Sequence, residues 1–183
     1  RDPVEPIPEL LTKTIQNKIV MVTGAGGSIG SELCRQILKI KPEVLLLAER
    51  TEYALYAINA ELLEKFNHDG VEIISLLADV KDESRMREIM TTWKVNTVYH
   101  AAAYKHVPLV EHNPMEGVIN NVFGTWTTAR VARECGVEHF TLISTDKAVR
   151  PTNVMGASKR LCELILQSMA SEKSGKTIFT MVR

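Results

Sequence analysis

The sequence predicts an α/β domain built on a doubly wound parallel sheet with helices on both faces. Three observations support this prediction: six short apolar runs alternate with helical patterns, no repeat or low-complexity segment interrupts them, and a glycine-rich turn follows the first run. Such alternation favours parallel strands joined by right-handed crossovers. The 183 residues suffice for one domain with a substantial core, but not for two ordinary domains.

The first half of the chain supplies three strands and the turns between them. Residues 1–17 are predicted to form a proline-rich linker and a short helix over 9–16, and the domain proper is predicted over 18–183. Strands are predicted over 18–22, 44–48 and 71–78, with a turn at Asp69 and Gly70. The first helix should run to about Ile40, before Pro42, and the second from residue 51 or 52 to 67.

The second half continues the alternation. A helix is predicted over 82–93 with Asp82 as its N-cap, and long helices over 114–135 and 153–173. The remaining strands are predicted over 97–102, 139–144 and 177–182. Open α/β sheets bind ligands beyond the carboxyl ends of their strands. We therefore expect another ligand-facing loop after the sixth strand, and interpret the sequence as truncated before a substrate-binding part.

Composition narrows the class of protein. Lys and Arg total 22, as do Asp and Glu, so the charge balance gives no reason to expect a nucleic-acid or membrane-surface partner. Three scattered cysteines, Cys34, Cys135 and Cys162, fit buried thiols in a reducing compartment better than a disulfide framework. No pattern suggests a metal site. A soluble, cytoplasmic protein is predicted, because neither a membrane-span run nor a signal-peptide pattern occurs.

The glycine-rich turn indicates dinucleotide binding. Gly24, Gly27 and Gly30 follow a buried strand in the spacing G-x-x-G-x-x-G and open a helix. The first glycine permits a tight turn, the second lets the backbone approach a pyrophosphate, and the third lets helix and strand pack closely. Ser28 and Ile29 begin the helix, whose free N–H groups and positive dipole end favour phosphates.

The ends of the next two strands should select the cofactor. Glu49 lies 19 residues after Gly30, close to the offset at which an acidic residue holds the ribose hydroxyls of NAD. Arg50 could instead meet the extra phosphate of NADP, so NAD is predicted and NADP is the alternative. Asp79 and Val80 end the third strand, where an adenine contact is expected; a cap for the next helix is the other interpretation.

A second group of functional residues follows the fifth strand. Met155 and Lys159 lie at i and i+4 and so share one helix face. Many hydride-transferring enzymes place Tyr and Lys at this spacing, with Ser or Thr upstream, but a Met thioether cannot transfer a proton. Either this is not an active site, or neighbouring groups such as Asp146 and Lys147 perform the proton chemistry.

Several motifs, taken together, resemble the extended short-chain dehydrogenase/reductases. More narrowly, the chain is similar to nucleotide-sugar 4,6-dehydratases that act on UDP-N-acetylglucosamine, in the large membrane-anchored subgroup that carries Met in place of Tyr. The motifs are TGAGGSIG from Thr23, Asp79-Val80, HAAAYKHVP from His100 with Ala101 and Ala102, NVFGT from Asn121, STDKA from Ser144, and the pair Met155 and Lys159.

The resemblance implies a Rossmann-type fold, bound NAD, a UDP-sugar substrate and a homo-oligomer paired through long helices. It also implies that the full-length protein lies at the cytoplasmic face of the inner membrane, joined to an anchor through a linker like the one that begins at Arg1. Lys105, after the fourth strand, is assigned to the sugar or diphosphate. Asn121 matches a helix asparagine that stabilises a local bend and a water chain, and is grouped with the substrate side.

The implied reaction is C4 oxidation, loss of water across C5–C6 and hydride return to C6. Lys159 would bind the nicotinamide ribose, and Thr145 the C4 oxygen. Lys147 is assigned as the C5 base and Asp146 as the C6 acid, with the reverse left open, and Asp146 also as acceptor of the C4 hydroxyl proton. A UDP-sugar 4-epimerase and a non-catalytic NAD-binding module are the alternatives. Without the substrate-binding part, the chain alone is expected to turn over poorly.

Overall fold

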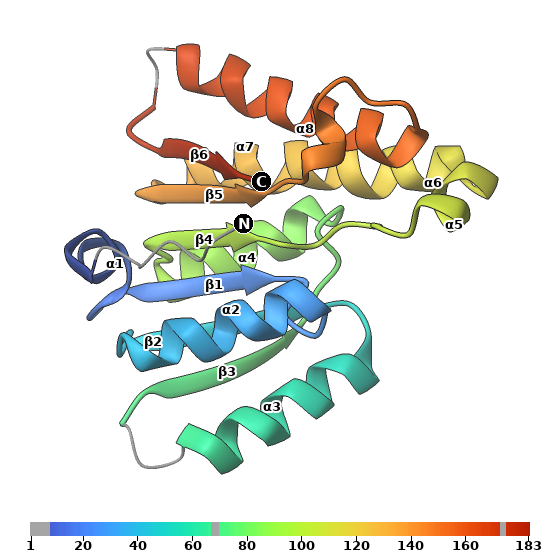
Figure 1. Ribbon diagram of the computed structural model, residues 1–183. Coiled ribbons are helices and arrows are strands. Elements are labelled where there is room, and N and C mark those ends of the chain that lie inside the picture. The colour runs from blue at the N-terminus through green and yellow to red at the C-terminus, as the bar shows by residue number, and fades with distance from the viewer. Residues whose placement is uncertain (1–7, 67–69, 173–174) are drawn as a thin grey trace.

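The computed structural model describes residues 8–66, 70–172 and 175–183. Its core is a six-stranded parallel sheet in the order β3-β2-β1-β4-β5-β6 (Figure 1). The predicted doubly wound fold is confirmed, and this strand order is that of dinucleotide-binding domains. The strands are β1 (Ile19–Thr23), β2 (Val44–Glu49), β3 (Glu72–Leu77), β4 (Thr97–His100), β5 (His139–Ile143) and β6 (Ile178–Val182).

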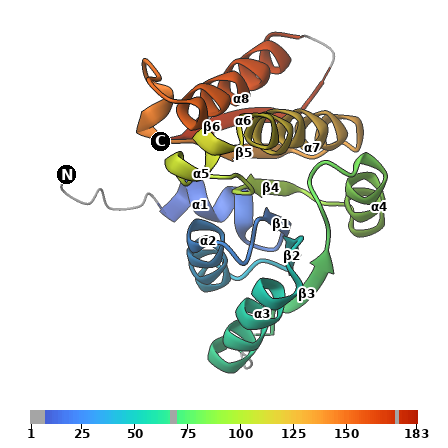
Figure 2. The ribbon, with the colours of Figure 1, turned by 90° about the vertical axis from the view of Figure 1, so that its right-hand side faces the viewer.

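Helices cover both faces of the sheet, as Figure 2 shows for α2 and α4. On one face lie α1 (Pro8–Ile15), α2 (Ser28–Lys39) and α3 (Glu52–Phe66), and on the other α4 (Glu83–Trp93), α7 (Gly124–Glu134) and α8 (Val154–Ser171). Alternate strand residues supply the two cores: Val20 and Val22 pack toward α2, whereas Met21 packs on the opposite face. Burial on both faces explains why the strands are almost purely apolar.

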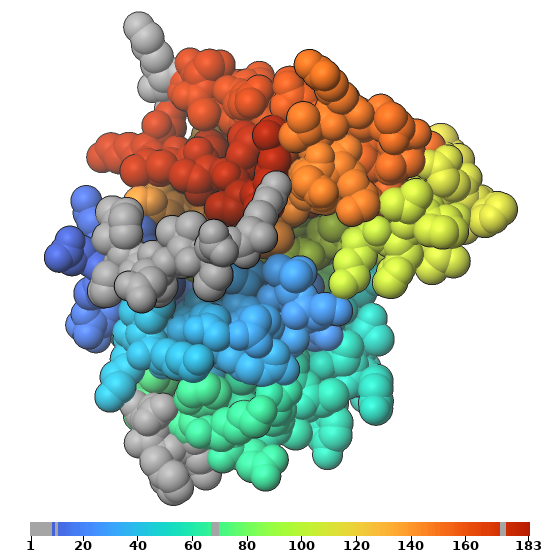
Figure 3. Space-filling view, in the orientation of Figure 1, coloured from blue at the N-terminus to red at the C-terminus, as the bar shows by residue number. Residues whose placement is uncertain are grey.

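The crossover between β3 and β4 creates the ligand-binding edge. The chain forms β1, β2 and β3 outward in one direction and then returns to place β4 on the other side of β1. A crevice is expected at such a reversal, beyond the carboxyl ends of the strands. In the space-filling view, the yellow-green segment after β4 and the orange segment after β5 adjoin at the right-hand edge, where these strands end (Figure 3).

Helix ends follow the predicted signals in several places. Asp82 caps α4, because its carboxylate accepts a hydrogen bond of 3.0 Å from the Arg85 backbone N–H. α2 ends before Lys41, which has a positive φ of 57°, and Pro42. Gly70 has φ +71°, as a turn requires, although its predicted partner Asp69 lies outside the described residues. The proposed linker at 1–7 and the helix end at residue 173 also lie outside them.

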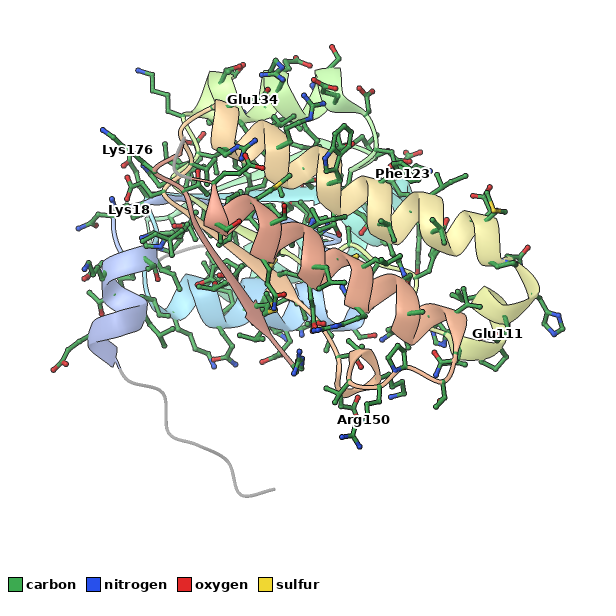
Figure 4. All side chains as sticks on the ribbon, turned by 90° about the horizontal axis from the view of Figure 1, so that it is seen from above. Lys18, Glu111, Phe123, Glu134, Arg150 and Lys176 are labelled. Atoms are coloured by element: carbon green, nitrogen blue, oxygen red, sulfur yellow. The ribbon has the colours of Figure 1, made fainter. Side chains whose placement is uncertain are left out.

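Two predicted elements differ from the structure. The long helix over 114–135 is divided into α6 (Pro114–Val118), a π-helical segment η1 (Ile119–Phe123) and α7. The fourth strand ends at His100, two residues early, and a short helix that was not predicted, α5 (Val107–His112), follows it. Hydrogen bonds to distant residues hold both regions, so local sequence pattern did not reveal them. In Figure 4, α7 and α8 lie side by side, and Phe123 marks the start of α7.

Candidate active site

The glycine loop is closely packed on two sides. Gly24 has φ +67°, and a Cβ atom there would lie 2.7 Å from the Cα atom of Ala102. A Cβ atom on Gly30 would lie 2.0 Å from the Gly24 carbonyl oxygen, which no real contact permits. A Cβ atom on Gly27 would meet only that same oxygen, at 3.2 Å. The first and third glycines are therefore required by packing, and the second keeps the surface open.

Gly26 is a further constrained position that the sequence pattern did not single out. A Cβ atom there would lie 2.6 Å from the Cβ atom of Ala54 in α3. Its backbone N–H donates to Glu49, so the loop is tied to the end of β2 as well. The sequence shows the adjacent pair Gly26 and Gly27, but the need for glycine at position 26 depends on Ala54, 28 positions later.

Most of the predicted cofactor residues line one cavity of about 230 Å³, here called the glycine-loop cavity. The Glu49 carboxylate is half-buried there and accepts hydrogen bonds from the backbone N–H groups of Gly26, at 3.3 Å, and Thr51, at 3.0 Å. These bonds hold the carboxylate at the cavity wall. The predicted residues brought together are Gly24, Gly27, Glu49, Arg50, Val80, Ala101 and Ala102.

Asp79 lies beside this cavity, in a shallower hollow that it shares with Arg50. Its carboxylate accepts from the Lys81 backbone N–H at 2.9 Å and lies 3.4 Å from the Lys81 ammonium group. The helix-cap interpretation of Asp79 is not supported, because Asp82 caps α4 instead. An adenine contact through Asp79 stays a prediction.

Tyr104 forms part of the wall on the β4 side. The Arg50 guanidinium carbon lies 4.9 Å from the centroid of its ring, a cation–π contact across the mouth of the glycine-loop cavity. The backbone of Tyr104 is held by Asn121, whose Oδ1 accepts from its N–H at 2.7 Å and whose Nδ2 donates to its C=O at 3.0 Å. Asn121 thus fixes the loop at Tyr104, which forms part of the wall of the glycine-loop cavity.

Asn121 itself is completely buried within η1 and does not line the glycine-loop cavity. Besides Tyr104, its Nδ2 donates to the Ser158 hydroxyl at 3.0 Å. A π-helical segment interrupts the helix at Asn121, and in this arrangement the amide is occupied by protein groups. We therefore assign Asn121 to loop positioning and no longer to the substrate side.

Lys105 lies at the glycine loop. Its ammonium group donates to the Ser28 hydroxyl at 3.1 Å, at the N-terminus of α2. This is where phosphates are favoured by the free N–H groups of a helix. The position fits a contact to a diphosphate, one of the two roles predicted for Lys105. A separate hollow of about 440 Å³ lies beside α5. Tyr104 and Lys105 contribute to its lining, but no predicted catalytic residue does.

Four of the five predicted catalytic residues line a second cavity of about 290 Å³, here called the lysine cavity. It lies between the segments that follow β4 and β5 and the first turns of α8. Asp146 is not among its lining residues, although its neighbours on both sides are. The predicted residues that line this cavity are Ile29, Ala101, Lys105, Thr145, Lys147, Met155 and Lys159.

Lys159 is the buried cation of this cavity. Lys159 is 5% exposed, and its ammonium group donates to the Ile143 carbonyl at 2.6 Å. Burial lowers the pKa of Lys159, while the nearby Cys162 and Glu163 act in the opposite direction. Met155, one turn earlier on α8, is buried as well. The predicted shared helix face is therefore present, with the amine at the end of β5.

The first turn of α8 packs directly on the loop that carries Asp146 and Lys147. Asn153 caps the helix by accepting from the Gly156 backbone N–H at 2.7 Å. A Cβ atom on Gly156 would lie 2.3 Å from the Lys147 carbonyl oxygen. Gly156 is thus a further residue on which the site depends. Its role was not predictable from the local sequence, because its contact is made with another element.

Asp146 and Lys147 begin a short 3₁₀ turn, η2 (Asp146–Ala148), and remain accessible, with side chains 71% and 51% exposed. The Thr145 hydroxyl donates to the Asp146 carboxylate at 3.0 Å, and the Lys147 ammonium group lies 3.5 Å from it. The hydrogen bond from Thr145, followed by the charge of Lys147, lowers the pKa of Asp146. The lowered pKa favours the ionised form of this carboxylate.

His100 lies beneath the site and belongs to the fold. It is completely buried at the end of β4, with Nδ1 2.8 Å from the Thr23 hydroxyl and Nε2 3.1 Å from the Thr125 hydroxyl. Burial, assisted by the charge of Lys159, lowers its pKa to about 3. Within the described ranges, no cluster of three His, Cys, Asp or Glu side chains is arranged to hold a metal ion. Among the helices described, none is long and apolar enough to cross a bilayer.

The strand order, the glycine loop and the two cavities at the carboxyl ends of the strands define a Rossmann-type domain of the short-chain dehydrogenase/reductase class. The chain belongs to the family described as "Polysaccharide biosynthesis protein", whose model matches residues 20–183. This confirms the resemblance stated from the sequence motifs at the level of the family.

The relatives of this chain include a capsular polysaccharide biosynthesis protein and two enzymes named for nucleotide sugars. It is 47% identical over 183 residues to the capsular polysaccharide biosynthesis protein CapD of Staphylococcus aureus, covering all of this chain and 30% of that protein. It is 34% identical over 143 residues to a UDP-N-acetylglucosamine 4,6-dehydratase (inverting) of Campylobacter jejuni, covering 78% of this chain and 40% of the relative. A UDP-glucose 4-epimerase of Rickettsia rickettsii is 32% identical over 170 residues, with coverages of 91% and 48%.

The fold has a close counterpart among solved structures. The X-ray structure of Pen from Bacillus thuringiensis matches with a TM-score of 0.83 and 32% identity, over 93% of this chain and 52% of that one. The chain thus spans about a third to a half of the length of these relatives.

Proposed function

We propose that this chain is the cofactor-binding and catalytic part of an NAD-dependent nucleotide-sugar 4,6-dehydratase that acts on UDP-N-acetylglucosamine. The observation that carries the proposal is the composition of the lysine cavity. A buried Met155 occupies the position of the usual Tyr, next to a buried Lys159, and Lys147 lines the same cavity. The Asp146 carboxylate lies outside the lining, 3.5 Å from the Lys147 ammonium group. The relationship to a named dehydratase supports this reading.

The residues of the glycine-loop cavity fit NAD. The backbone at Gly27 is open to a pyrophosphate, and Lys105 places a positive charge at the N-terminus of α2. The Glu49 carboxylate at the wall suits ribose hydroxyls and would repel a 2′-phosphate, while Arg50 is engaged with Tyr104. We therefore favour NAD over NADP. When bound, NAD⁺ supplies the acceptor for the C4 hydride.

The residues of the lysine cavity then divide the proton chemistry. Thr145 holds the C4 oxygen, and the charge of Lys159 stabilises negative charge that develops there. Asp146, which is ionised, accepts the C4 hydroxyl proton during oxidation. It then donates that proton to the C6 hydroxyl, which leaves as water. One carboxyl thus serves both steps.

Lys147 completes the cycle in this proposal. Once its ammonium group has given a proton to solvent, the Lys147 amine removes the C5 proton, which the C4 ketone has made acidic. The ammonium group that forms exchanges its protons with solvent and returns one proton to C5 when hydride reaches C6. Protons balance, since the C4 hydroxyl proton leaves in water and C5 regains a proton. Met155 takes no part in proton transfer and fills space beside Lys159.

The test uses the full-length enzyme, UDP-N-acetylglucosamine and D₂O, followed by NMR. We expect a C6 methyl signal and deuterium at C5. Asp146→Asn should suppress both reduction of bound NAD⁺ and elimination, whereas Met155→Leu should remain active. If Asp146→Asn reduced bound NAD⁺ at the normal rate, the double role of Asp146 would be wrong.

A UDP-sugar 4-epimerase is the second candidate, because a named relative of similar identity is one. An epimerase needs no acid–base pair at C5 and C6. It would invert C4 without a methyl signal or deuterium at C5, so the same experiment separates the two. Two further features stay predictions: assembly into a homo-oligomer through long helices, and attachment of the full-length protein at the cytoplasmic face of a membrane.

A further inference from the structure

Glu163 is a buried carboxylate to which the proposed chemistry assigns no role. Its side chain, on α8, is 0% exposed. Its two oxygens accept four hydrogen bonds: one from the Ser144 hydroxyl at 2.7 Å, one from Arg160 at 2.9 Å, and two from the Arg183 guanidinium at 2.8 Å each. The carboxylate is fully satisfied by groups from three elements.

Such a group is rarely explained by stability alone. The cost of removing charges from water often equals or exceeds what a buried ion pair returns, and well-packed apolar side chains can replace such pairs without loss. The Arg183 guanidinium, more than any other partner, holds the pKa of Glu163 down at about 2, so the group stays charged. A role in geometry is the better explanation, and its surroundings show which geometry.

Glu163 and Lys159 act on consecutive residues of the same strand end. They lie one helical turn apart on one face of α8. Lys159 donates to the carbonyl of Ile143, and Glu163 accepts from the hydroxyl of Ser144, the next residue. The loop Thr145–Lys147 begins immediately afterwards. The helix that provides the buried lysine therefore holds the start of the loop that provides the acid–base pair.

The third element is β6. The Ser144 backbone N–H donates to the Val182 carbonyl at 2.7 Å, and Arg183, the following residue, forms the two-pronged ion pair with Glu163. The exit of β5 is thus fixed from α8 and from β6 at once. Two hydrogen bonds in parallel restrict rotation as well as distance, which a single bond cannot do.

We propose that Glu163 is a positioning residue that sets the distance between Lys159 and the Thr145–Lys147 loop by holding Ser144 between α8 and β6. The proposal rests on the proposed function, since it assigns the loop a catalytic role. Glu163 does not touch the reacting atoms. Its removal should therefore slow the chemical steps while leaving the glycine-loop cavity and nucleotide binding intact.

The test compares four variants of the full-length enzyme by kcat, KM for UDP-N-acetylglucosamine, bound NAD and melting temperature. Ser144→Ala removes only the hydroxyl, and Glu163→Gln keeps an oxygen acceptor but no charge. Glu163→Leu removes both functions. The matched control is Arg160→Gln. Arg160 and Glu163 both lie on α8, so the ion pair between them does not connect α8 to β5 or β6.

We expect Glu163→Leu to lower kcat about 10²-fold, the effect of roughly 1 Å of misplacement, and Ser144→Ala and Glu163→Gln to lower it about tenfold. KM and bound NAD should stay within about twofold, because ground-state binding is untouched. Arg160→Gln should match the wild type.

Two results overturn the inference alone: wild-type kcat in both Ser144→Ala and Glu163→Gln, or a fall in activity that only follows the loss of folded, NAD-loaded protein. If Glu163→Leu does not fold, the kcat of Ser144→Ala decides between the two outcomes, because this variant keeps the ion pair between Glu163 and Arg183. A wild-type enzyme that yields no product with a C6 methyl group overturns the proposed function, and this inference with it.

Discussion

The buried histidine at the end of β4 should make the domain sensitive to mild acid. His100 is 0% exposed, and both ring nitrogens face threonine hydroxyls, Thr23 and Thr125. Burial lowers its pKa from an ordinary value of 6.5 to about 3. Between these values the unfolded chain binds a proton that the folded chain does not. Stability linked to this group is therefore complete above pH 6.5 and falls as the pH decreases toward 3.

The size of the effect follows from one proton. Each pH unit well inside this interval is worth about 1.4 kcal/mol. Lowering the pH from 6.5 to 4.5 should remove about 2 kcal/mol, because at pH 6.5 only half of the unfolded chains bind the proton. Typical domains have about 5–15 kcal/mol in total, so the loss is readily measured. Replacement by Gln keeps a donor and an acceptor near the two threonines and cannot titrate.

Urea denaturation of the wild type and His100→Gln at pH 7, 6, 5 and 4 tests this reasoning. Carboxylates contribute to both curves, so the difference in unfolding free energy isolates the histidine. We expect that difference to change by about 1.4 kcal/mol per pH unit below pH 6, in favour of the variant. Parallel curves, or an imidazole NMR titration in the folded state near pH 6, would refute the assignment of a neutral buried ring.

Three other predictions concern the two cavities. Gly30→Ala places a Cβ atom 2.0 Å from the Gly24 carbonyl oxygen, so the loop must move; calorimetry should show NAD affinity reduced by about tenfold or more. Lys105→Met keeps the apolar stem and removes the charge; it should weaken NAD binding by about 1 kcal/mol at low salt and less at high salt. Asn121→Leu leaves the backbone N–H and C=O of Tyr104 without their partner, so urea denaturation should show a loss of about 2–4 kcal/mol; unchanged stability would mean that water replaces the amide.

The strands and the glycine loop were predictable because their signals are local. A strand buried on both faces is apolar along its whole length, and a turn that requires φ +67° and close approach needs glycine at Gly24. The same applies to Asp82, whose cap acts within its own helix. In these places the residues that determine the local structure lie within the same short stretch of sequence as that structure.

The site features that were missed join distant parts of the chain. Gly26 depends on Ala54, Gly156 on the Lys147 carbonyl, and Glu163 on Ser144. The π-helical segment is of the same kind, because Asn121 within it bonds the backbone of Tyr104, 17 residues earlier. The hydrophobic periodicity of one segment contains no information about a hydrogen bond to a distant segment. Such contacts are found only when the fold has brought the two segments together.

Met155 shows how the two kinds of information combine. The sequence shows that no proton can pass through this position, but it leaves the site either inactive or rearranged. The structure places Met155 in the first turn of α8, which packs on the loop of Asp146 and Lys147 closely enough to require Gly156. It also leaves Asp146 accessible and ionised, hydrogen-bonded to the threonine assigned to the C4 oxygen. A carboxylate in that state accepts a proton before it can donate one, so in the proposed mechanism oxidation at C4 must precede the loss of water. The substrate imposes the same order, because the C4 ketone must form before the C5 proton becomes acidic enough to be removed.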